Sequence, residues 1–448
     1  MVPPRPRVPW TRLVLGGFFV TVVLPLAIEH YRIQAELEGL AAPLQNRIQR
    51  TRALGIALEW KDLEPNLPPE QNAAHLYHVA LAELGKGGPA NPAKRAAWVW
   101  KPGALEKSAR ALSLLEQAAA RPHCFFPRDW KEVAEGRWNE IGRLKELLDL
   151  ACAKAEFEAR KNRIGSAMGW LKVAATIARH AGEDPSPNGW QVKVDLESLV
   201  VESLQRALDP GNMTPKDLGV AREAVAGLSG DPVRALEGEL VQRVHFFQTL
   251  DSKNADEPDA GGWVRFVNQF SGAGYYTRPY RPLLQDPALV ERAFRARVLE
   301  RWIPFLVAAK ASHGDKDRLS TALDAFDLVV TVAPLAIDEG ERRLSEPREF
   351  VVMTYLEALA NRRLAAQALD LVAFRLRTGR FPSRLEEAGE VLLDPFNDKP
   401  LRYKRRASGF LLYSIGLDGV DDGGVAGTWN GDVLFELPKS PLPKAPHG

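Results

Sequence analysis

The chain has 448 residues, of which 59 are lysine or arginine and 57 are aspartate or glutamate, so its formal net charge is only +2. A nucleic-acid-binding protein carries a basic excess or a basic patch, and we therefore expect no nucleic-acid partner. Hydrophobic residues make up 45% of the chain, which is ordinary for a globular protein with a sizeable core. The length allows two or three domains, or one helical domain with a small appendage.

The two cysteines, Cys124 and Cys152, are too few for a disulfide framework. Each lies in a stretch typical of a buried core position, where free cysteine is common. They would pair only if the fold brings them together in an oxidising compartment. Both interpretations stay open at the level of the sequence.

Residues 13–28 carry no charged side chain and predict a transmembrane helix. This segment alone spans only about 24 Å as a helix, but Trp10 and Tyr31 as interfacial aromatics extend the element to about 33 Å, which is enough to cross a bilayer. Three basic residues precede it: Arg5, Arg7 and Arg12. The positive-inside rule keeps the N-terminus in the cytoplasm and puts residues 32–448 on the other side.

A cleaved signal peptide is the alternative for this segment, because its hydrophobic region could be nearly as long. No small-x-small cleavage site follows the segment, since Pro25 stands two residues before Ala27 and the bulky Ile28 comes after it. We therefore favour an uncleaved anchor.

Apolar residues recur at spacings of three and four along most of the middle of the chain, which predicts a mainly α fold of stacked helix hairpins. The expected helices span residues 29–54, 70–84, 104–120, 138–159, 164–180, 192–208, 215–228, 233–250, 289–311, 319–335 and 350–377. No fixed period or repeat consensus accompanies them, so we assign no repeat family.

Residues 256–286 interrupt the helical pattern. This stretch is rich in glycine and holds six aromatic residues: Trp263, Phe266, Phe270, Tyr275, Tyr276 and Tyr280. It is either a loop that stacks on a sugar or a peptide, or a long surface loop held in place by its own apolar side chains. We favour the second interpretation.

The chain carries no phosphate-binding glycine loop, no zinc-protease motif and no nucleophile elbow. His75 and His78 have a spacing that could chelate a metal on a helix, but the sequence offers no third ligand, and solvated histidines are the simpler interpretation. The motifs therefore give no positive reason to propose catalysis.

The C-terminal segment predicts a small α+β module. Gly379 is well placed to end the helix 350–377 in a left-handed conformation. Residues 401–406 and 410–415 then predict two strands joined by a hairpin, and residues 433–437 a third. We expect the helix to pack on a three-stranded antiparallel sheet.

An acidic loop lies between the second and third strands, with the sequence Asp418-Gly419-Val420-Asp421-Asp422-Gly423-Gly424. Its three carboxylates repel one another unless they are solvated or neutralised, and its glycines allow backbone carbonyls to turn inward. Calcium takes six to eight oxygen ligands of these two kinds. The loop is therefore either a calcium site or an ordinary acidic turn in water.

Residues 364–436, about a sixth of the chain, resemble the C-terminal part of the major pseudopilin of type II secretion systems. The shared motifs are a helix that ends in Gly379-Arg380-Phe381-Pro382, an Asp394-Pro395-aromatic turn that leads to Tyr403, and the run Tyr413-Ser414-Ile415-Gly416-Leu417-Asp418-Gly419. In that family, the loop after the second strand binds calcium through aspartate side chains and backbone carbonyls. The resemblance therefore implies calcium ligands at five positions: the carbonyl of Leu417, then Asp418, Asp421, Asp422 and Asp432.

Three departures limit the resemblance. The turn 394–400 and the segment 424–432 are longer than their counterparts, which could shift the later ligands. Pseudopilins also carry a glutamate at the fifth position of the mature N-terminal helix, where this chain has Val22 if Gly17-Phe18 is the junction. We therefore do not expect the chain to polymerise as a pilus.

The whole layout is similar to a group of uncharacterised bacterial membrane-anchored proteins, which have an anchor, a helical body with a segment like Pro69-Glu70-Gln71-Asn72-Ala73-Ala74 and a pseudopilin-like end. This resemblance implies an architecture and no activity. The expected parts are a cytoplasmic tail with the anchor (1–31), an extracytoplasmic helical domain (32–345), a helix with the pseudopilin-like sheet (346–437) and a disordered tail (438–448).

We expect a single-pass protein of the bacterial inner (cytoplasmic) membrane with most of the chain on the periplasmic side. Its expected role is that of a helical scaffold or binding protein with a protein or cell-envelope partner. The first alternative is an accessory of a type II secretion-like apparatus. The second is an envelope enzyme, which would need a deep cleft lined by convergent acidic or histidine residues.

Overall fold

The structure is a computed structural model that describes residues 24–89, 94, 98–101, 103–127, 140–228, 230–245, 287–312, 315–319, 321, 346–427 and 431–438. Over these residues, the fold is mainly helical with a small three-stranded antiparallel sheet near the C-terminus, as the sequence predicts. Most of the predicted anchor, the aromatic loop 256–286 and the tail after Pro438 lie outside the described residues. Within the described part, no helix is long and apolar enough to cross a membrane.

The chain divides into two compact units. The first comprises residues 1–59, 240–307 and 324–346, and the second comprises residues 60–239, 308–323 and 347–448. The domain boundaries predicted from the sequence stay a prediction.

The described part of the first unit consists of helices α2 (Leu24–Ala41) and α3 (Leu44–Ala53) and most of α16 (Pro287–Ser312). Arg47 of α3 donates to the carbonyl of Ala296 at 2.7 Å and pairs with Glu300 at 3.2 Å, which joins α3 to α16. The break between α2 and α3 falls at Pro43, within the predicted helix 29–54.

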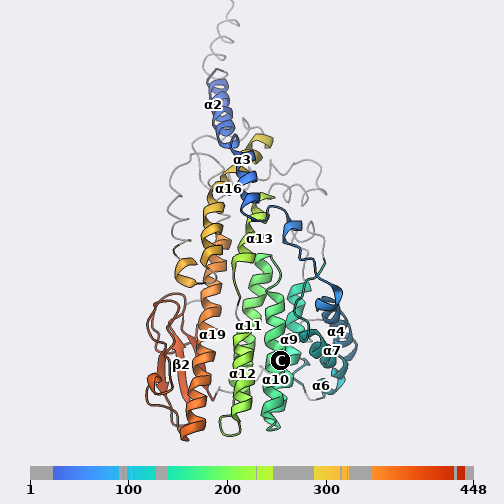
Figure 1. Cartoon of the computed structure of the whole chain (residues 1–448), viewed down its shortest axis with the longest axis vertical. Coiled ribbons are helices and arrows are strands. Elements are labelled where there is room, and N and C mark those ends of the chain that lie inside the picture. The colour runs from blue at the N-terminus through green and yellow to red at the C-terminus, as the bar shows by residue number, and fades with distance from the viewer. Residues whose placement is uncertain are drawn as a thin grey trace, which may run out of the picture. The chain divides into compact units, whose positions relative to one another are not determined.

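The second unit contains the other described helices, and Figure 1 labels those of the α type. Its α-helices are α4 (Ala74–Gly87), α6 (Ala104–Lys107), α7 (Ala109–Ala119), α9 (Glu140–Arg160), α10 (Ile164–Ala181), α11 (Pro187–Ala207), α12 (Pro215–Ala226), most of α13 (Val233–Val244) and α19 (Glu346–Thr378). Its short 3-10 helices are η2 (Trp60–Leu63), η3 (Pro69–Gln71) and η6 (Leu385–Glu387). The predicted hairpin is confirmed, because α9 and α10 pack against each other, and α10 also packs on α11 and α12.

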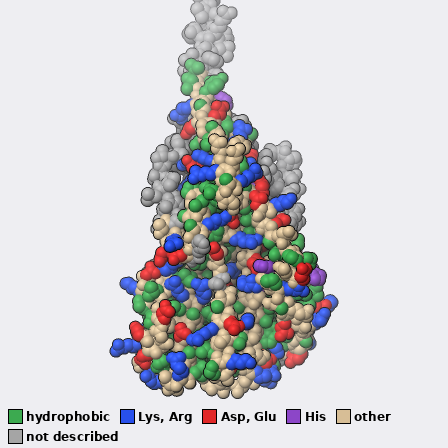
Figure 2. All heavy atoms as spheres, viewed as in Figure 1, with side chains coloured by type: hydrophobic (Ala, Val, Ile, Leu, Met, Phe, Trp, Pro, Cys, Tyr) green, Lys and Arg blue, Asp and Glu red, His purple; other side chains and the backbone are tan. Residues whose placement is uncertain are grey.

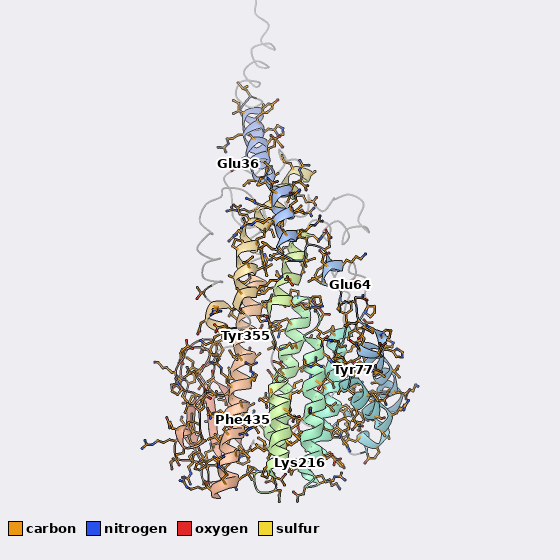
Figure 3. The ribbon with its side chains drawn as sticks, viewed as in Figure 1. Glu36, Glu64, Tyr77, Lys216, Tyr355 and Phe435 are labelled. Carbon is orange, nitrogen blue, oxygen red and sulfur yellow. The ribbon has the colours of Figure 1, made fainter. Side chains whose placement is uncertain are left out.

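The sheet of the second unit has the order β1 (Arg402–Arg405), β2 (Phe410–Ser414) and β3 (Val433–Leu437), with antiparallel pairing throughout. Phe410 and Phe435 are fully buried and stack with their ring centroids 6.3 Å apart (Figure 3 labels Phe435). They belong to one hydrophobic core with residues of α9, α10, α11, α12 and α19. The sheet therefore shares its core with the helical hairpins.

The outer edge of β3 is capped by a side chain of α11. The amide nitrogen of Gln205 donates to the carbonyl of Leu434 at 3.5 Å, and its amide oxygen accepts from the backbone N–H of Glu436 at 3.3 Å. This one side chain satisfies two backbone groups that an edge strand would otherwise leave unpaired.

Cys124 and Cys152 are both free and buried. Burial raises the pKa of the Cys152 thiol to about 12. Of the two interpretations left open by the sequence, the structure shows the core positions and no disulfide between them.

Acidic and basic side chains alternate over the face shown in Figure 2. Neither sign gathers into a large patch over the coloured part of that face, in keeping with the near-balance of 59 basic and 57 acidic residues.

Candidate functional site

The acidic loop of the C-terminal module lies over the outer face of the sheet. Gly424 has a φ of +86°, and a Cβ atom there would lie 2.5 Å from Cδ2 of Leu411 and 3.4 Å from Cδ1 of Tyr413. Only glycine permits such a close approach in this backbone conformation. Since the helices cover the other face, β2 is buried along its whole length.

A buried carboxylate, that of Asp394, connects the turn before β1 to the end of β2 through hydrogen bonds. Asp394 is 0% exposed and accepts hydrogen bonds from the hydroxyl of Ser414 at 2.8 Å and from the backbone N–H of Ile415 at 2.9 Å. Arg402 of β1 donates to the same carboxylate at 3.0 Å. A buried carboxylate needs such donors, because its desolvation is otherwise uncompensated.

Arg402 also reaches the acidic loop. Its Nε donates to Asp421 at 2.8 Å, and this hydrogen bond is the largest of the effects that lower the pKa of Asp421. Lys404, two residues further along β1, donates to the carbonyl of Gly423 at 2.7 Å and lies over the ring of Tyr413. Two cations of the chain itself therefore neutralise part of the loop.

The five predicted calcium ligands differ in their burial and partners. Leu417, Asp418 and Asp422 are exposed, and Asp418 accepts a hydrogen bond from the backbone N–H of Val420 at 3.1 Å. Asp421 is held by Arg402. Over the described residues, no three acidic, histidine or cysteine side chains are gathered as a metal site.

Asp432 differs from the other four, because it is only 3% exposed. Its Oδ2 accepts from the backbone N–H groups of Gly424 at 2.6 Å and of Val425 at 3.3 Å, whereas its Oδ1 is buried with no hydrogen-bond partner. A carboxylate oxygen removed from water without a donor is costly, and a cation beside it would remove this cost. The buried end of the loop thus suits a cation.

Sequence reasoning missed Arg402 and Lys404 as partners of the acidic loop, and Asp394 as the buried partner of Arg402. The Asp394-Pro395 pair indicated only a turn, and the alternating basic residues of β1 were a further signal, since Arg402 and Lys404 have the spacing of two that puts side chains on one face of a strand. His75 and His78 are both exposed on α4.

No protein-family model, curated protein or solved structure matches the chain.

Proposed function

We propose that the chain is a membrane-anchored, extracytoplasmic scaffold or binding protein whose C-terminal module is stabilised by a bound calcium ion. The anchor is supported by the uncharged segment 13–28 and the three arginines before it. The observation that carries the calcium proposal is the buried, partnerless Oδ1 of Asp432 under an acidic loop.

The calcium ion would be held by Asp432, by Asp418 and Asp422 and by the carbonyl of Leu417. Asp421 belongs to the same proposed set, but its ion pair with Arg402 must open before it can serve as a ligand. A bound calcium ion supplies positive charge that links these oxygens. Because Asp432 immediately precedes β3, such a link would fasten the loop to the sheet.

Thermal unfolding of the full-length chain, with calcium and with a chelator, tests this proposal. An ion at about 100 times its dissociation constant that binds only the folded state adds about 2.7 kcal/mol of stability. We expect calcium to raise the unfolding midpoint, and Asp432→Asn to abolish the rise. Glu386→Gln is the matched control, because it removes an exposed carboxylate of the same module outside the loop.

An unchanged unfolding midpoint in the wild-type protein would contradict the calcium proposal. The loop would then be an acidic turn neutralised by Arg402 and Lys404.

The anchor has a separate test. Single cysteines introduced at Glu386 and at Val2 should be labelled by a membrane-impermeant reagent from opposite sides of the cytoplasmic membrane. Labelling of both from the same side contradicts the proposed topology.

An accessory role in a type II secretion-like apparatus is the second candidate. It is supported by the pseudopilin resemblance of residues 364–436, which form a helix and a three-stranded sheet that share one core. Cross-linking in cells followed by purification of the chain should then recover secretion components. Their absence, with other envelope proteins recovered, favours the scaffold role.

A further inference from the structure

A cavity of about 230 Å³ opens beside α19 in the second unit. Four residues of α19 line it at spacings that put them on one helix face: Tyr355, Leu359, Arg362 and Arg363. The opposite wall comes from residues 315–317 and from Leu393 and Asp398 in the segment before β1. The cavity thus lies apart from the acidic loop and its proposed ligands.

The acidic side chains of the cavity are already engaged. Lys316 forms ion pairs with Asp317, at 2.6 Å, and with Asp398. The carboxylate of Asp315 accepts from the backbone N–H groups of Asp317 and Arg318, each at 3.0 Å, and the hydrogen bond from Arg318 is the largest of the effects that lower its pKa. The carboxylates of Asp315, Asp317 and Asp398 therefore have partners among the residues around the cavity.

The two arginines, by contrast, lack a carboxylate partner in the described part of the chain. Arg363 donates one N–H to the carbonyl of Leu393 at 2.8 Å, which aims its guanidinium along the cavity wall. Burial, and next the charge of Arg362, lower the pKa of Arg363. Two adjacent, half-buried guanidinium groups that form no ion pair with the described residues are the arrangement that an anion would stabilise.

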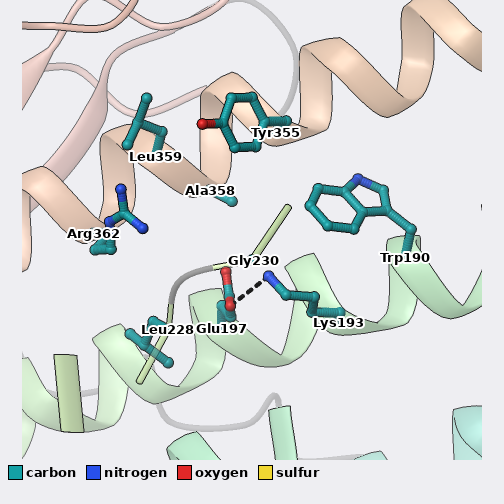
Figure 4. A pocket seen from close by; sticks show the side chains of 9 residues that line it. All are labelled: Trp190, Lys193, Glu197, Leu228, Gly230, Tyr355, Ala358, Leu359 and Arg362. Carbon is teal, nitrogen blue, oxygen red and sulfur yellow. Dashed lines mark hydrogen bonds and ion pairs between the residues drawn. The ribbon is translucent and has the colours of Figure 1, made fainter. Parts of the chain in front are cut away.

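Glu197, an acidic residue that lines a neighbouring pocket together with Arg362, is neutralised by a different cation. On α11, Lys193 and Glu197 form a buried ion pair at 2.6 Å, and Figure 4 shows this pair and Arg362 facing the same gap. A Cβ atom at Gly230 would lie 2.6 Å from Cε of Lys193, so this glycine provides the room that the lysine needs. Burial raises the pKa of Glu197 despite its partners.

We propose that the cavity beside α19 binds a small oxyanion, a phosphate or a carboxylate group, through the guanidinium groups of Arg362 and Arg363. Guanidinium groups present paired N–H donors that match the oxygens of either group. The ring of Tyr355 and the side chain of Leu359 complete a wall that would hold the rest of a small ligand. This inference depends on neither the anchor nor calcium.

Calorimetric titration of the full-length chain with inorganic phosphate, and separately with acetate, tests the proposal. We expect saturable binding of at least one of the two anions, and a loss of affinity of about tenfold or more in Arg362→Gln and in Arg363→Gln. Arg377→Gln is the matched control, because it removes the same charge from an exposed position near the end of the same helix. Tighter binding of phosphate points to a phosphorylated ligand, and tighter binding of acetate to a carboxylate.

A second measurement uses only the wild-type protein, in case either variant fails to fold. The bound anion should protect Arg362 and Arg363, but not Arg377, from an arginine-selective dicarbonyl reagent, as mapped by mass spectrometry. Binding of neither anion overturns the proposal. Equal anion affinity in the variants Arg362→Gln, Arg363→Gln and Arg377→Gln also overturns it. So does protection of Arg377 from the reagent to the same extent as Arg362 and Arg363.

Discussion

At the scale of single residues, Arg402 holds two carboxylates that differ in burial. Asp394 is fully buried and serves the end of β2 as well, whereas Asp421 lies on the exposed loop. An ion pair with an exposed partner contributes little because water competes for it. A buried carboxylate that accepts several hydrogen bonds contributes more, because its removal leaves those donors buried without an acceptor.

We therefore predict unequal effects of two substitutions that each remove one partner of Arg402. Asp394→Ala leaves the hydroxyl of Ser414 and the N–H of Ile415 without an acceptor, and should lower the free energy of unfolding by about 3 kcal/mol. Asp421→Ala should cost far less. Urea denaturation of both variants measures the difference in the free energy of unfolding. Equal losses would show that the hydrogen bonds of the buried Asp394 do not stabilise the turn.

His180 is a second residue whose burial has a measurable consequence. It is 0% exposed, and its Nδ1 lies 2.7 Å from the hydroxyl of Tyr77. Burial first, and then the charge of Arg179, lower the pKa of His180 to about 3. Near neutral pH, the folded protein therefore holds this imidazole in its uncharged form.

The pKa of His180 predicts how stability depends on pH. Below about pH 6.5 the unfolded chain binds a proton at this histidine, whereas the folded chain binds none until about pH 3. The contribution is complete above pH 6.5 and is lost as the pH falls towards 3, by up to about 1.4 kcal/mol per pH unit.

Urea unfolding between pH 7 and pH 4 should show a shallower pH dependence in His180→Gln than in wild type. The exposed His78 is the control position, and His78→Gln should keep the wild-type slope. A slope in His180→Gln as steep as in wild type would mean that other groups account for the acid sensitivity.

At the scale of elements, the sequence predicts those whose pattern is local. Strand β3 has the predicted bounds, and the helix α10 begins at the predicted Ile164. The helix α11 begins at Pro187 and not at residue 192, because Ser186 caps it by accepting from the N–H of Gly189. The predicted helix 104–120 is divided into α6 and α7 at Ser108.

The contacts between distant residues could not be predicted in this way. Arg402 meets Asp421 because β1 and the loop after β2 fold onto one face of the sheet, and nothing local to either residue indicates the other. The buried Lys193 is a further case, since its place beside Gly230 depends on a turn far along the chain. The calcium ligands implied by the pseudopilin resemblance stay a prediction.

Two glycines, one just before the acidic loop and one within it, give a matched test of how tightly this region packs. Gly416 and Gly419 have nearly the same φ, +71° and +70°. A Cβ atom at Gly416 would lie 2.2 Å from the carbonyl oxygen of Gly431, whereas a Cβ atom at Gly419 would have no neighbouring atom within 4 Å. Gly419→Ala should therefore cost about 1 kcal/mol for the left-handed backbone alone.

Gly416→Ala should cost clearly more, because the backbone of Gly431 must also move. Chemical denaturation of the two variants separates the contributions. Similar losses of unfolding free energy in the two variants would indicate that the backbone near Gly431 moves at little cost. The close approach at Gly416 would then not contribute to stability.

At the scale of the whole molecule, the second unit joins distant stretches of the chain. Residues 60–239 and 347–448 contribute to one compact unit, and the sheet shares its hydrophobic core with α9, α10 and α11. Units that share a core unfold together. The C-terminal module is therefore expected to behave as part of the helical body.

Phe410→Ala tests this coupling. Phe410 is fully buried between Phe381 and Phe435, and its truncation should cost about 3–5 kcal/mol. Hydrogen exchange followed by mass spectrometry should show lower protection in α10 as well as in β2. Loss of protection confined to the sheet would instead make the module an independent folding unit.

The cap that Gln205 places on β3 has a consequence for assembly. Sheets recruit additional strands, from a neighbouring molecule or from an extended peptide, through backbone groups left open at an edge. On β3 the carbonyl of Leu434 and the N–H of Glu436 are already bonded to the side chain of Gln205. Strand addition at the β3 edge would therefore require the side chain of Gln205 to be displaced from these two backbone groups first.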